Sequence, residues 1–140
     1  MFIGVDLVEI PRIAEAVKNP RFLRRIYTPA ELAFAQELSS TTRKAEFFAG
    51  RFAVKEATYK AVSALYQQRV RQTSDAPALR RVPLLVFTDI EALNRNGLPI
   101  LSFHGQTGKL LTIFPTLDAQ VSLSHTSALS TAVVLLRLPD

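Results

Sequence analysis

Residues 43–67 read RKAEFFAGRFAVKEATYKAVSALYQ, and this stretch decides the fold. It contains no proline and repeats its apolar residues at helical spacing, so it predicts one long α-helix. Gly50 costs about 1 kcal/mol relative to alanine inside a helix, which indicates that another backbone segment or a ligand approaches closely there. The helix also carries a stripe of small side chains, favouring tight packing on a sheet, and a stripe of aromatic ones: Ala53, Ala57, Ala61 and Ala64, and Phe48, Phe52 and Tyr59.

The sequence before this helix predicts a strand followed by two shorter helices. Residues 2–8 form an apolar run of strand length, and Pro11 fits the first turn of a helix that stops at Asn19-Pro20. Thr28-Pro29-Ala30-Glu31 has the pattern of a capping box, which starts a helix that runs to about Leu38. Residues 39–42 then supply a break and the next N-cap.

After the long helix the pattern changes to that of strands. Residues 68–83 are polar and predict a loop, whereas 84–93 and 98–103 predict two strands joined by a turn at Asn96-Gly97. A short helix over 107–114 and strands at 121–124 and 131–138 follow. The sum is an α+β fold class, with one long helix packed on an antiparallel sheet.

Length and composition limit what the chain can be. With 140 residues, 48% of them hydrophobic and 21% charged, the chain predicts a single globular domain over residues 1–140. The absence of cysteine excludes disulfides, thiolate zinc sites and thiol nucleophiles. The N-terminus lacks the basic start of a signal peptide, and no apolar run reaches the roughly 20 residues of a membrane span. We therefore expect a cytoplasmic protein that does not span a membrane.

Positive charge is concentrated in the first part of the chain. Residues 1–81 hold 14 Lys and Arg against 8 Asp and Glu, a net charge of +6, whereas residues 82–140 hold 3 against 4, a net charge of −1. Such an asymmetry implies a polyanionic partner. Nucleic acid, an anionic membrane, a phosphorylated small molecule and an acidic protein all fit at this point.

Two carboxylates are candidates for chemistry. Asp6 lies in an apolar strand, where a buried carboxylate must meet a cation, several donors or solvent, and an edge position in water is an equally good reading. Glu56 precedes Lys60 by four residues, which taken alone favours an ordinary ion pair along the helix. If the two carboxylates converge, they form an all-oxygen site of the kind that Mg²⁺ prefers.

Other residues near these carboxylates suit phosphate groups. Arg51, Lys55 and Lys60 lie on the same helix as Glu56. His125 follows a predicted strand, where a lone histidine is more often structural than catalytic, although it is a plausible donor to a phosphate. The familiar glycine-rich nucleotide-binding motifs are absent from the sequence.

Three segments together resemble the holo-acyl-carrier-protein synthase family, the small type of 4′-phosphopantetheinyl transferase. They are residues 3–13 (IGVDLVEIPRI), 48–57 (FAGRFAVKEA) and 121–126 (VSLSHT), and residues 96–99 (NGLP) are similar to a turn of that family. The resemblance implies transfer of the phosphopantetheine arm of coenzyme A to a serine of apo-acyl carrier protein, with release of adenosine 3′,5′-bisphosphate. It also implies the fold of that family.

The resemblance assigns roles to individual residues. It implies that Asp6 and Glu56 bind Mg²⁺ with the diphosphate of coenzyme A, and that Lys60 and His125 join them as catalytic residues that contact phosphate oxygens. Glu56, Asp6 and a metal-bound water remain open as the general base. For Arg43 and Lys44, a site for the 3′-phosphate and a solvated helix start are equally good readings. The expected coenzyme-binding residues are Arg43, Lys44, Arg51, Lys60, Gly97, Pro99, His125 and Thr126.

The resemblance also implies partners. Acyl carrier proteins are acidic, and four arginines near the first helix are expected to dock them: Arg12, Arg21, Arg24 and Arg25. A homotrimer with active sites shared between neighbouring copies is expected as well, and neither nucleic acid nor a membrane is an expected partner. The alternative is a basic nucleic-acid-binding α+β module without catalysis, which would retain oligonucleotides with an affinity that falls steeply as salt rises.

Overall fold

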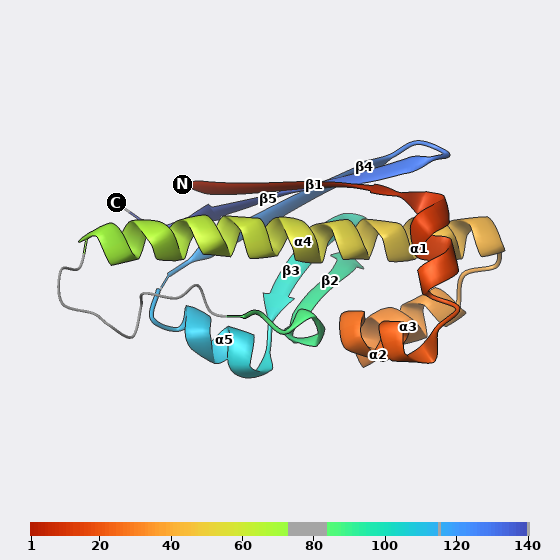
Figure 1. Cartoon of the computed structure of the whole chain (residues 1–140), viewed down its shortest axis with the longest axis horizontal. Helices are drawn as coiled ribbons and strands as arrows, with labels where there is room; N and C mark the ends of the chain where they lie inside the picture. The colour runs from red at the N-terminus through yellow and green to blue at the C-terminus, as the bar shows by residue number, and fades with distance from the viewer. Residues whose placement is uncertain (73–83, 115, 140) are drawn as a thin grey trace.

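A single long helix, α4 (Thr41–Gln72), is the axis on which the other elements pack (Figure 1). The computed structural model describes residues 1–72, 84–114 and 116–139. The remaining elements are, in chain order, β1 (Phe2–Glu9), α1 (Ile10–Ala16), α2 (Pro20–Ile26), α3 (Pro29–Gln36), the 3₁₀ helix η2 (Phe87–Asp89), β2 (Ile90–Arg95), β3 (Leu98–Phe103), α5 (Gly105–Leu111), β4 (Asp118–His125) and β5 (Leu129–Arg137). The predicted α+β class, with a long helix on an antiparallel sheet, is confirmed.

The larger sheet covers one side of α4. Its three antiparallel strands have the order β1-β5-β4, so β1 is an edge strand (Figure 1). Residues of β1 alternate between the two faces: Gly4 and Val8 are buried, whereas Val5 and Leu7 are exposed. A Cβ atom on Gly4 would lie 1.8 Å from the Ala57 carbonyl oxygen. The strand and helix backbones are therefore in direct contact, as the stripe of small side chains predicts.

A two-stranded sheet lies on another side of α4. β2 and β3 form an antiparallel hairpin whose turn residues, Asn96 and Gly97, have φ angles of 52° and 80°. Both angles fit a two-residue turn in the left-handed region, which asparagine and glycine favour. The predicted Asn96-Gly97 hairpin is confirmed.

The predicted strand over 84–93 is wrong in its first half. Phe87–Asp89 form η2, and β2 begins only at Ile90. The physical reason is Asp89, whose carboxylate accepts the Thr107 N–H at 3.0 Å and whose carbonyl accepts the His104 N–H at 2.7 Å. These bonds turn the chain toward the start of α5 before strand pairing can begin.

The helical caps explain where the other predictions held and where they failed. Thr28 and Glu31 form the predicted capping box at the start of α3. Helix α2 was not expected, because Asn19-Pro20 reads as a stop; instead the Asn19 side chain accepts the Arg21 N–H, and Pro20 occupies the first turn. α4 is longer than predicted and includes residues 68–72 of the expected loop, while the rest of that loop, 73–83, lies outside the described residues.

Candidate functional site

Asp6 faces α4 rather than bulk water. The Lys60 ammonium donates hydrogen bonds of 2.8 Å to the Asp6 carboxylate and 2.8 Å to the Val5 carbonyl. The Asp6 side chain is 14% exposed and that of Lys60 is 50% exposed. Asp6 is therefore a paired carboxylate at the inner face of an edge strand, and Lys60 forms its ion pair across to β1 rather than along its own helix.

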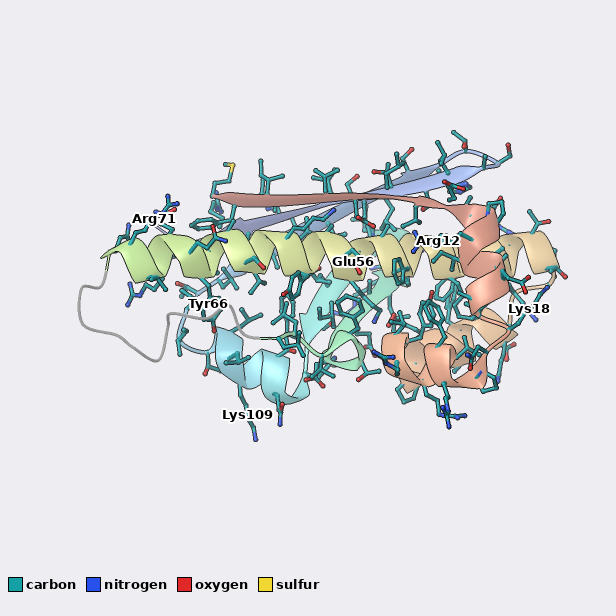
Figure 2. All side chains as sticks on the ribbon, in the orientation of Figure 1. Arg12, Lys18, Glu56, Tyr66, Arg71 and Lys109 are labelled. Atoms are coloured by element: carbon teal, nitrogen blue, oxygen red, sulfur yellow. The ribbon has the colours of Figure 1, made fainter. Side chains whose placement is uncertain are left out.

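Glu56 belongs to the same cluster. Burial raises the pKa of Glu56 above its ordinary value, the charge of Asp6 raises this pKa further, and Lys60 and Arg12 lower it. Figure 2 shows Glu56 on the middle of α4 with Arg12 of α1 beside that helix. The fold thus brings together the two carboxylates and two cations from three elements, which we call the carboxylate cluster (Asp6, Arg12, Glu56 and Lys60).

The donor set of this cluster fits a hard divalent cation. Asp6 and Glu56 supply oxygen ligands, and their mutual repulsion is the kind that a cation relieves. Among the described residues, no group of three or more His, Cys, Asp or Glu could hold a metal ion. A site with two carboxylates is still ordinary for Mg²⁺, which usually takes its remaining ligands from water and substrate phosphates.

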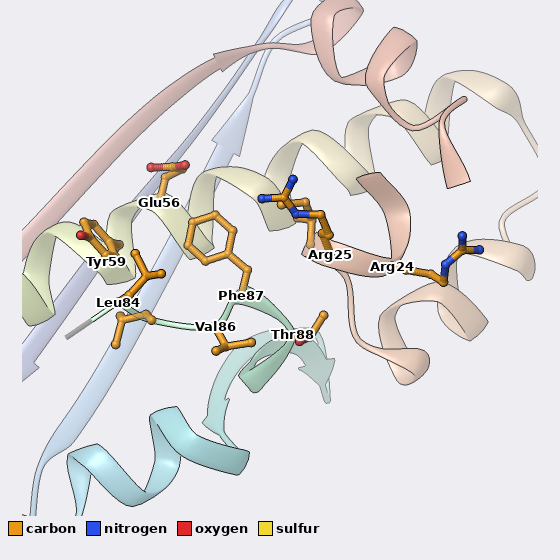
Figure 3. Close-up of a pocket in the computed structure, with 10 residues that line it drawn as sticks. Arg24, Arg25, Glu56, Tyr59, Leu84, Val86, Phe87 and Thr88 are labelled. Atoms are coloured by element: carbon orange, nitrogen blue, oxygen red, sulfur yellow. The ribbon is translucent and has the colours of Figure 1, made fainter. Parts of the chain in front are cut away.

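A pocket of about 640 Å³ opens beside Glu56. α4 contributes Glu56 and Tyr59 to its wall, and residues 84–88 form the facing wall (Figure 3). Arg24 and Arg25 of α2, two of the four arginines expected to dock a carrier protein, also line it; Arg12 and Arg21 are exposed on α1 and α2. The volume is in the range of small-molecule sites.

His125 lines a different pocket, of about 270 Å³, on another flank of α4. Arg43 and Arg51 line it as well, whereas Lys44 is half-buried and does not. Glu56 and Arg51 are five residues apart, so they point about 140° from each other around the helix. Within one chain, the structure therefore separates His125, Arg43 and Arg51 from the carboxylate cluster.

The guanidinium of Arg51 hydrogen-bonds to other residues of the protein. Its Nε donates to the Ala92 carbonyl at 2.7 Å, and its Nη2 donates to the Asn94 side chain at 3.2 Å. The guanidinium carbon also lies 4.5 Å from the centre of the Phe47 ring. Burial lowers the pKa of Arg51, which nevertheless stays positively charged because guanidinium groups titrate so high.

The remaining expected coenzyme residues lie in turns and strands near this second pocket. Gly97 is exposed at the hairpin turn, and Pro99 pairs across β2–β3 with Asn94, which lines the pocket. Thr126 shapes the β4–β5 turn, where its hydroxyl oxygen accepts the N–H groups of Ala128 and Leu129. These side chains are not part of the carboxylate cluster.

Lys55 differs most from expectation. It was expected to suit a phosphate, but its side chain is fully buried and its ammonium donates to Glu31 at 2.6 Å and to the Phe87 carbonyl at 2.9 Å. Burial raises the pKa of Glu31 and lowers that of Lys55, and the attraction within the pair opposes both shifts. Sequence reasoning identified Glu31 only as a helix cap, because no pattern in the sequence shows which distant cation it meets.

Comparisons with known proteins identify the family of this chain. The pattern of the 4′-phosphopantetheinyl transferase superfamily matches residues 2–111. A holo-[acyl-carrier-protein] synthase of Solibacter usitatus is 33% identical over 136 residues, covering 95% of this chain and 94% of that protein. One of Koribacter versatilis is 35% identical over 136 residues, with the same coverage.

Solved structures give the same relationship. An ACPS–CoA complex from Chronobacterium ammoniagenes superposes with a TM-score of 0.74 at 32% identity, covering 99% of this chain and 98% of that one. A holo-(acyl-carrier-protein) synthase from Bacillus anthracis in complex with CoA (3′,5′-ADP) gives a TM-score of 0.68 at 30% identity, covering 96% and 94%. The chain therefore belongs to the 4′-phosphopantetheinyl transferase superfamily.

Proposed function

We propose that this protein transfers the 4′-phosphopantetheine arm of coenzyme A to a serine of apo-acyl carrier protein, releasing adenosine 3′,5′-bisphosphate. The observation that carries the proposal is that Asp6 and Glu56, from distant parts of the chain, lie close enough for their charges to interact, with Lys60 paired to Asp6 and a pocket of small-molecule size beside Glu56. The relatives named as synthases and the coenzyme complexes of similar fold support it.

Asp6 and Glu56 are the residues that would hold Mg²⁺ in this proposal. When bound, the ion supplies charge neutralisation for the diphosphate of coenzyme A, which is the main requirement of phosphoryl transfer. Lys60 orients Asp6 through its 2.8 Å bond, and its half-exposed ammonium is free on its outer side to contact a phosphate oxygen. The serine oxygen bonds to the phosphorus as the bond to the leaving bisphosphate breaks, and the serine proton passes to a base that the geometry leaves open between the two carboxylates and solvent.

We further propose that the complete site is shared between copies of the chain. Arg43, Arg51 and His125 lie in a pocket that shares no lining residue with the pocket beside Glu56. A coenzyme long enough to use both sets of residues would bind between one copy's carboxylate cluster and its neighbour's second pocket. The homotrimer expected from the family resemblance supplies such a neighbour.

The outer face of the three-stranded sheet supports this assembly. Four exposed aliphatic residues, which we call the outer sheet patch, lie on β1 and β5: Ile3 (56% exposed), Val5 (49%), Leu7 (61%) and Val133 (40%). Val5 and Val133 are directly paired across the two strands. A contiguous apolar surface of this kind is typical of a protein interface, and a second copy of this chain is the occupant we propose.

The exposed arginines suit an acidic carrier protein. Arg24 and Arg25 line the pocket beside Glu56. The positive charge of Arg12 lowers the pKa of Glu56. Arg21 is exposed on the same helix as Arg24. A carrier docked on these four residues would present its serine next to the carboxylate cluster. Complementary charge of this kind mainly raises the rate of association and fixes orientation.

A mass measurement tests the proposed function. The protein, apo-acyl carrier protein, coenzyme A and Mg²⁺ are mixed, and the mass of the carrier is expected to rise by one phosphopantetheine. The mass increase should be abolished by chelation of the metal and by either Asp6→Ala or Glu56→Ala. Circular dichroism should show that both variants remain folded. Glu15→Ala is the matched control, because Glu15 is an exposed carboxylate paired only with Lys18 in the described contacts. Unchanged turnover in Asp6→Ala or Glu56→Ala would remove the metal assignment.

A further inference from the structure

The pocket beside Glu56 has two walls that are distant in the chain. One wall is α4, with Glu56 and Tyr59, and the other is the segment 84–88, whose Phe87 ring points toward the helix (Figure 3). Segment 84–88 is not part of a strand, so no ladder of backbone hydrogen bonds fixes its distance from α4. Side chains must therefore set the width of the pocket.

Lys55 provides a direct polar link between these walls. It immediately precedes Glu56 on α4, and its ammonium donates to the carbonyls of Phe87, the first residue of η2, and Ile90, the residue directly after η2. Its third donor binds Glu31 at 2.6 Å. An ammonium has three N–H donors, so all of them are used inside the protein and none is left for a substrate.

Burying the Glu31–Lys55 ion pair costs desolvation free energy. Both side chains are fully buried, and the second carboxylate oxygen of Glu31 has no hydrogen-bond partner among the described residues. Replacing a buried ion pair by apolar side chains of similar volume is often neutral or stabilising. Stability alone is thus a weak reason for this pair, whereas its position behind the pocket wall suggests a role in the site.

The other contacts of the segment do not replace this link. The Val86 N–H donates to the Thr107 hydroxyl at 3.2 Å, which ties the segment to α5. The Phe87 ring meets Phe52 of α4 edge-on with 6.5 Å between ring centres, a contact that allows sliding. The hydrogen bonds of Lys55 are directional, so they fix the segment along α4 as well as toward it.

We propose that Glu31 and Lys55 are positioning residues that hold segment 84–88 at the distance from Glu56 that coenzyme A requires. Glu31 orients the Lys55 ammonium, Lys55 binds the two carbonyls, and Phe87 is thereby placed against the substrate bound at Glu56. The proposal rests on the proposed function, because that function places coenzyme A beside Glu56.

Two variants and one control test it. Lys55→Met removes the ammonium but leaves Glu31 buried without its partner, which endangers folding. The double variant Glu31→Gln with Lys55→Met removes both charges, and glutamine retains the capping-box acceptor at the start of α3. Lys18→Met is the control, because it breaks an ion pair of 2.7 Å whose side chains are 72% and 75% exposed.

Two readouts are compared at a temperature where all variants are folded. In the double variant, hydrogen exchange of the amides between residues 85 and 90 should be faster than in the wild type, with other segments little changed. The KM for coenzyme A should rise about tenfold, because a small displacement of a positioning wall has effects of this size or larger. The KM for the carrier protein should stay the same, a split that a merely structural loss would not produce.

Chemical rescue gives a second test of the ammonium itself. Because the chain contains no cysteine, Lys55→Cys can be alkylated with bromoethylamine while unfolded and then refolded, which restores an ammonium on a side chain close to lysine in length. The KM for coenzyme A should return toward the wild-type value, and the unalkylated variant should remain impaired.

The outcomes separate this proposal from the proposed function. If the wild type shows no turnover, the proposed function is wrong, and a segment that positions coenzyme A is no longer required. An active wild type combined with a double variant of unchanged KM for coenzyme A, or of unchanged exchange in residues 85–90, would overturn the positioning role alone. Failure of the alkylated variant to recover would do the same.

Discussion

The Lys60 ammonium donates a hydrogen bond of 2.8 Å to Asp6, which lies 54 residues away in the chain. A second bond of 2.8 Å to the Val5 carbonyl fixes the same ammonium to the backbone of β1. Strand and helix are therefore held together at the point where Asp6 approaches Glu56. The spacing of Glu56 and Lys60 suggests a pair along the helix, but the fold uses this lysine to bring the two carboxylates into one cluster.

Replacing Lys60 should reduce activity much more than stability. Lys60 is half-exposed, whereas Asp6 is only 14% exposed. Lys60→Met should therefore lower the melting temperature by more than the loss of an exposed ion pair, which contributes about 0–1 kcal/mol, but the variant should stay folded at assay temperature. Its kcat/KM for coenzyme A should fall about a hundredfold, since one fewer cation faces the phosphates in the transition state. Steady-state kinetics check this, with Lys109→Met as an exposed control; equal losses in both variants would contradict it.

The stability of the metal-free protein should increase when Glu56 loses its charge. Burial first, and then Asp6, raise the pKa of Glu56 above its ordinary value of 4.5. A carboxyl group whose pKa is raised on folding favours the folded state fully below the unfolded pKa, and this contribution is lost as pH rises through the folded pKa. Glu56→Gln, which cannot ionise, should therefore be more stable than the wild type at neutral pH, measured by urea unfolding in the presence of chelator.

The same variant has a pH control and a metal control. The advantage of Glu56→Gln should shrink as pH falls and vanish below the ordinary pKa of glutamate, where both proteins carry a neutral group. Adding Mg²⁺ should stabilise the wild type more than the variant, because a ligand that binds only the folded state stabilises it by mass action. If the stability advantage of Glu56→Gln over the wild type grew as pH fell, the pKa of Glu56 would be lowered by folding rather than raised.

Two glycines on either side of the helix–sheet contact should respond differently to alanine. In Gly4→Ala the new Cβ would lie 1.8 Å from the Ala57 carbonyl oxygen and 2.8 Å from the Ala61 nitrogen, both of them backbone atoms that cannot rotate away. We expect a loss of at least about 2 kcal/mol in unfolding free energy. Denaturant unfolding measures it, and a loss of turnover should accompany it because Asp6 lies two residues further along β1.

Gly50→Ala is the matched comparison. Its new Cβ would meet only a side-chain carbon of Leu123 at 3.1 Å and the Ser130 hydroxyl at 3.6 Å. Alanine gains about 1 kcal/mol of helix propensity over glycine, and Leu123 can adjust, so stability should stay within about 1 kcal/mol of the wild type. A larger loss at Gly50 than at Gly4 would contradict the assignment of the backbone contact to Gly4.

The elements that sequence predicts well are those determined by local patterns. The long helix, the capping box at Thr28 and the turn at Asn96-Gly97 depend on neighbouring residues, and the structure confirms all three. Segment 84–89 has the composition of a strand, but the distant Thr107 N–H binds Asp89 and turns the chain. That contact has no local signature.

Prediction of the candidate site from sequence is limited in the same way, because the site also depends on contacts between distant residues. Asp6 and Glu56 were expected to meet only on the strength of a family resemblance, because the sequence does not show which strand residue faces which turn of the helix. Lys55 and Lys60 look alike in sequence, yet one is fully buried against Glu31 and the other is half-exposed beside Asp6. Their difference follows from the angle between them around α4, which matters only once the sheet and segment 84–88 have packed on it.

A charge in the outer sheet patch should separate the subunits of the proposed trimer. Val133→Lys places an ammonium on the central strand of the sheet, where an interface would have to bury it at a high cost in free energy. The variant should run as a folded monomer in light scattering and lose turnover. Ile113→Lys is the control, because Ile113 is similarly exposed, at 46%, but lies outside the sheet. A monomeric wild type, or a trimeric Val133→Lys, would contradict the assembly.

Mixing two inactive variants should restore activity if the site is shared. Glu56→Ala retains the second pocket with His125, and His125→Ala retains the carboxylate cluster, so each variant alone has every site defective. When subunits of the two are mixed in equal amounts and allowed to exchange, a site is intact only where the cluster of a His125→Ala chain meets the second pocket of a Glu56→Ala chain.

Random assembly makes about a quarter of the sites intact, and turnover should recover to about that fraction of the wild type. Mixing Glu56→Ala with Asp6→Ala is the control, because both defects lie in the same cluster and no arrangement of subunits can repair it. No recovery in the test mixture despite verified exchange would show that each chain works alone. Recovery in the control would show that Asp6 and Glu56 of different chains can form one site, which contradicts a cluster built within one chain.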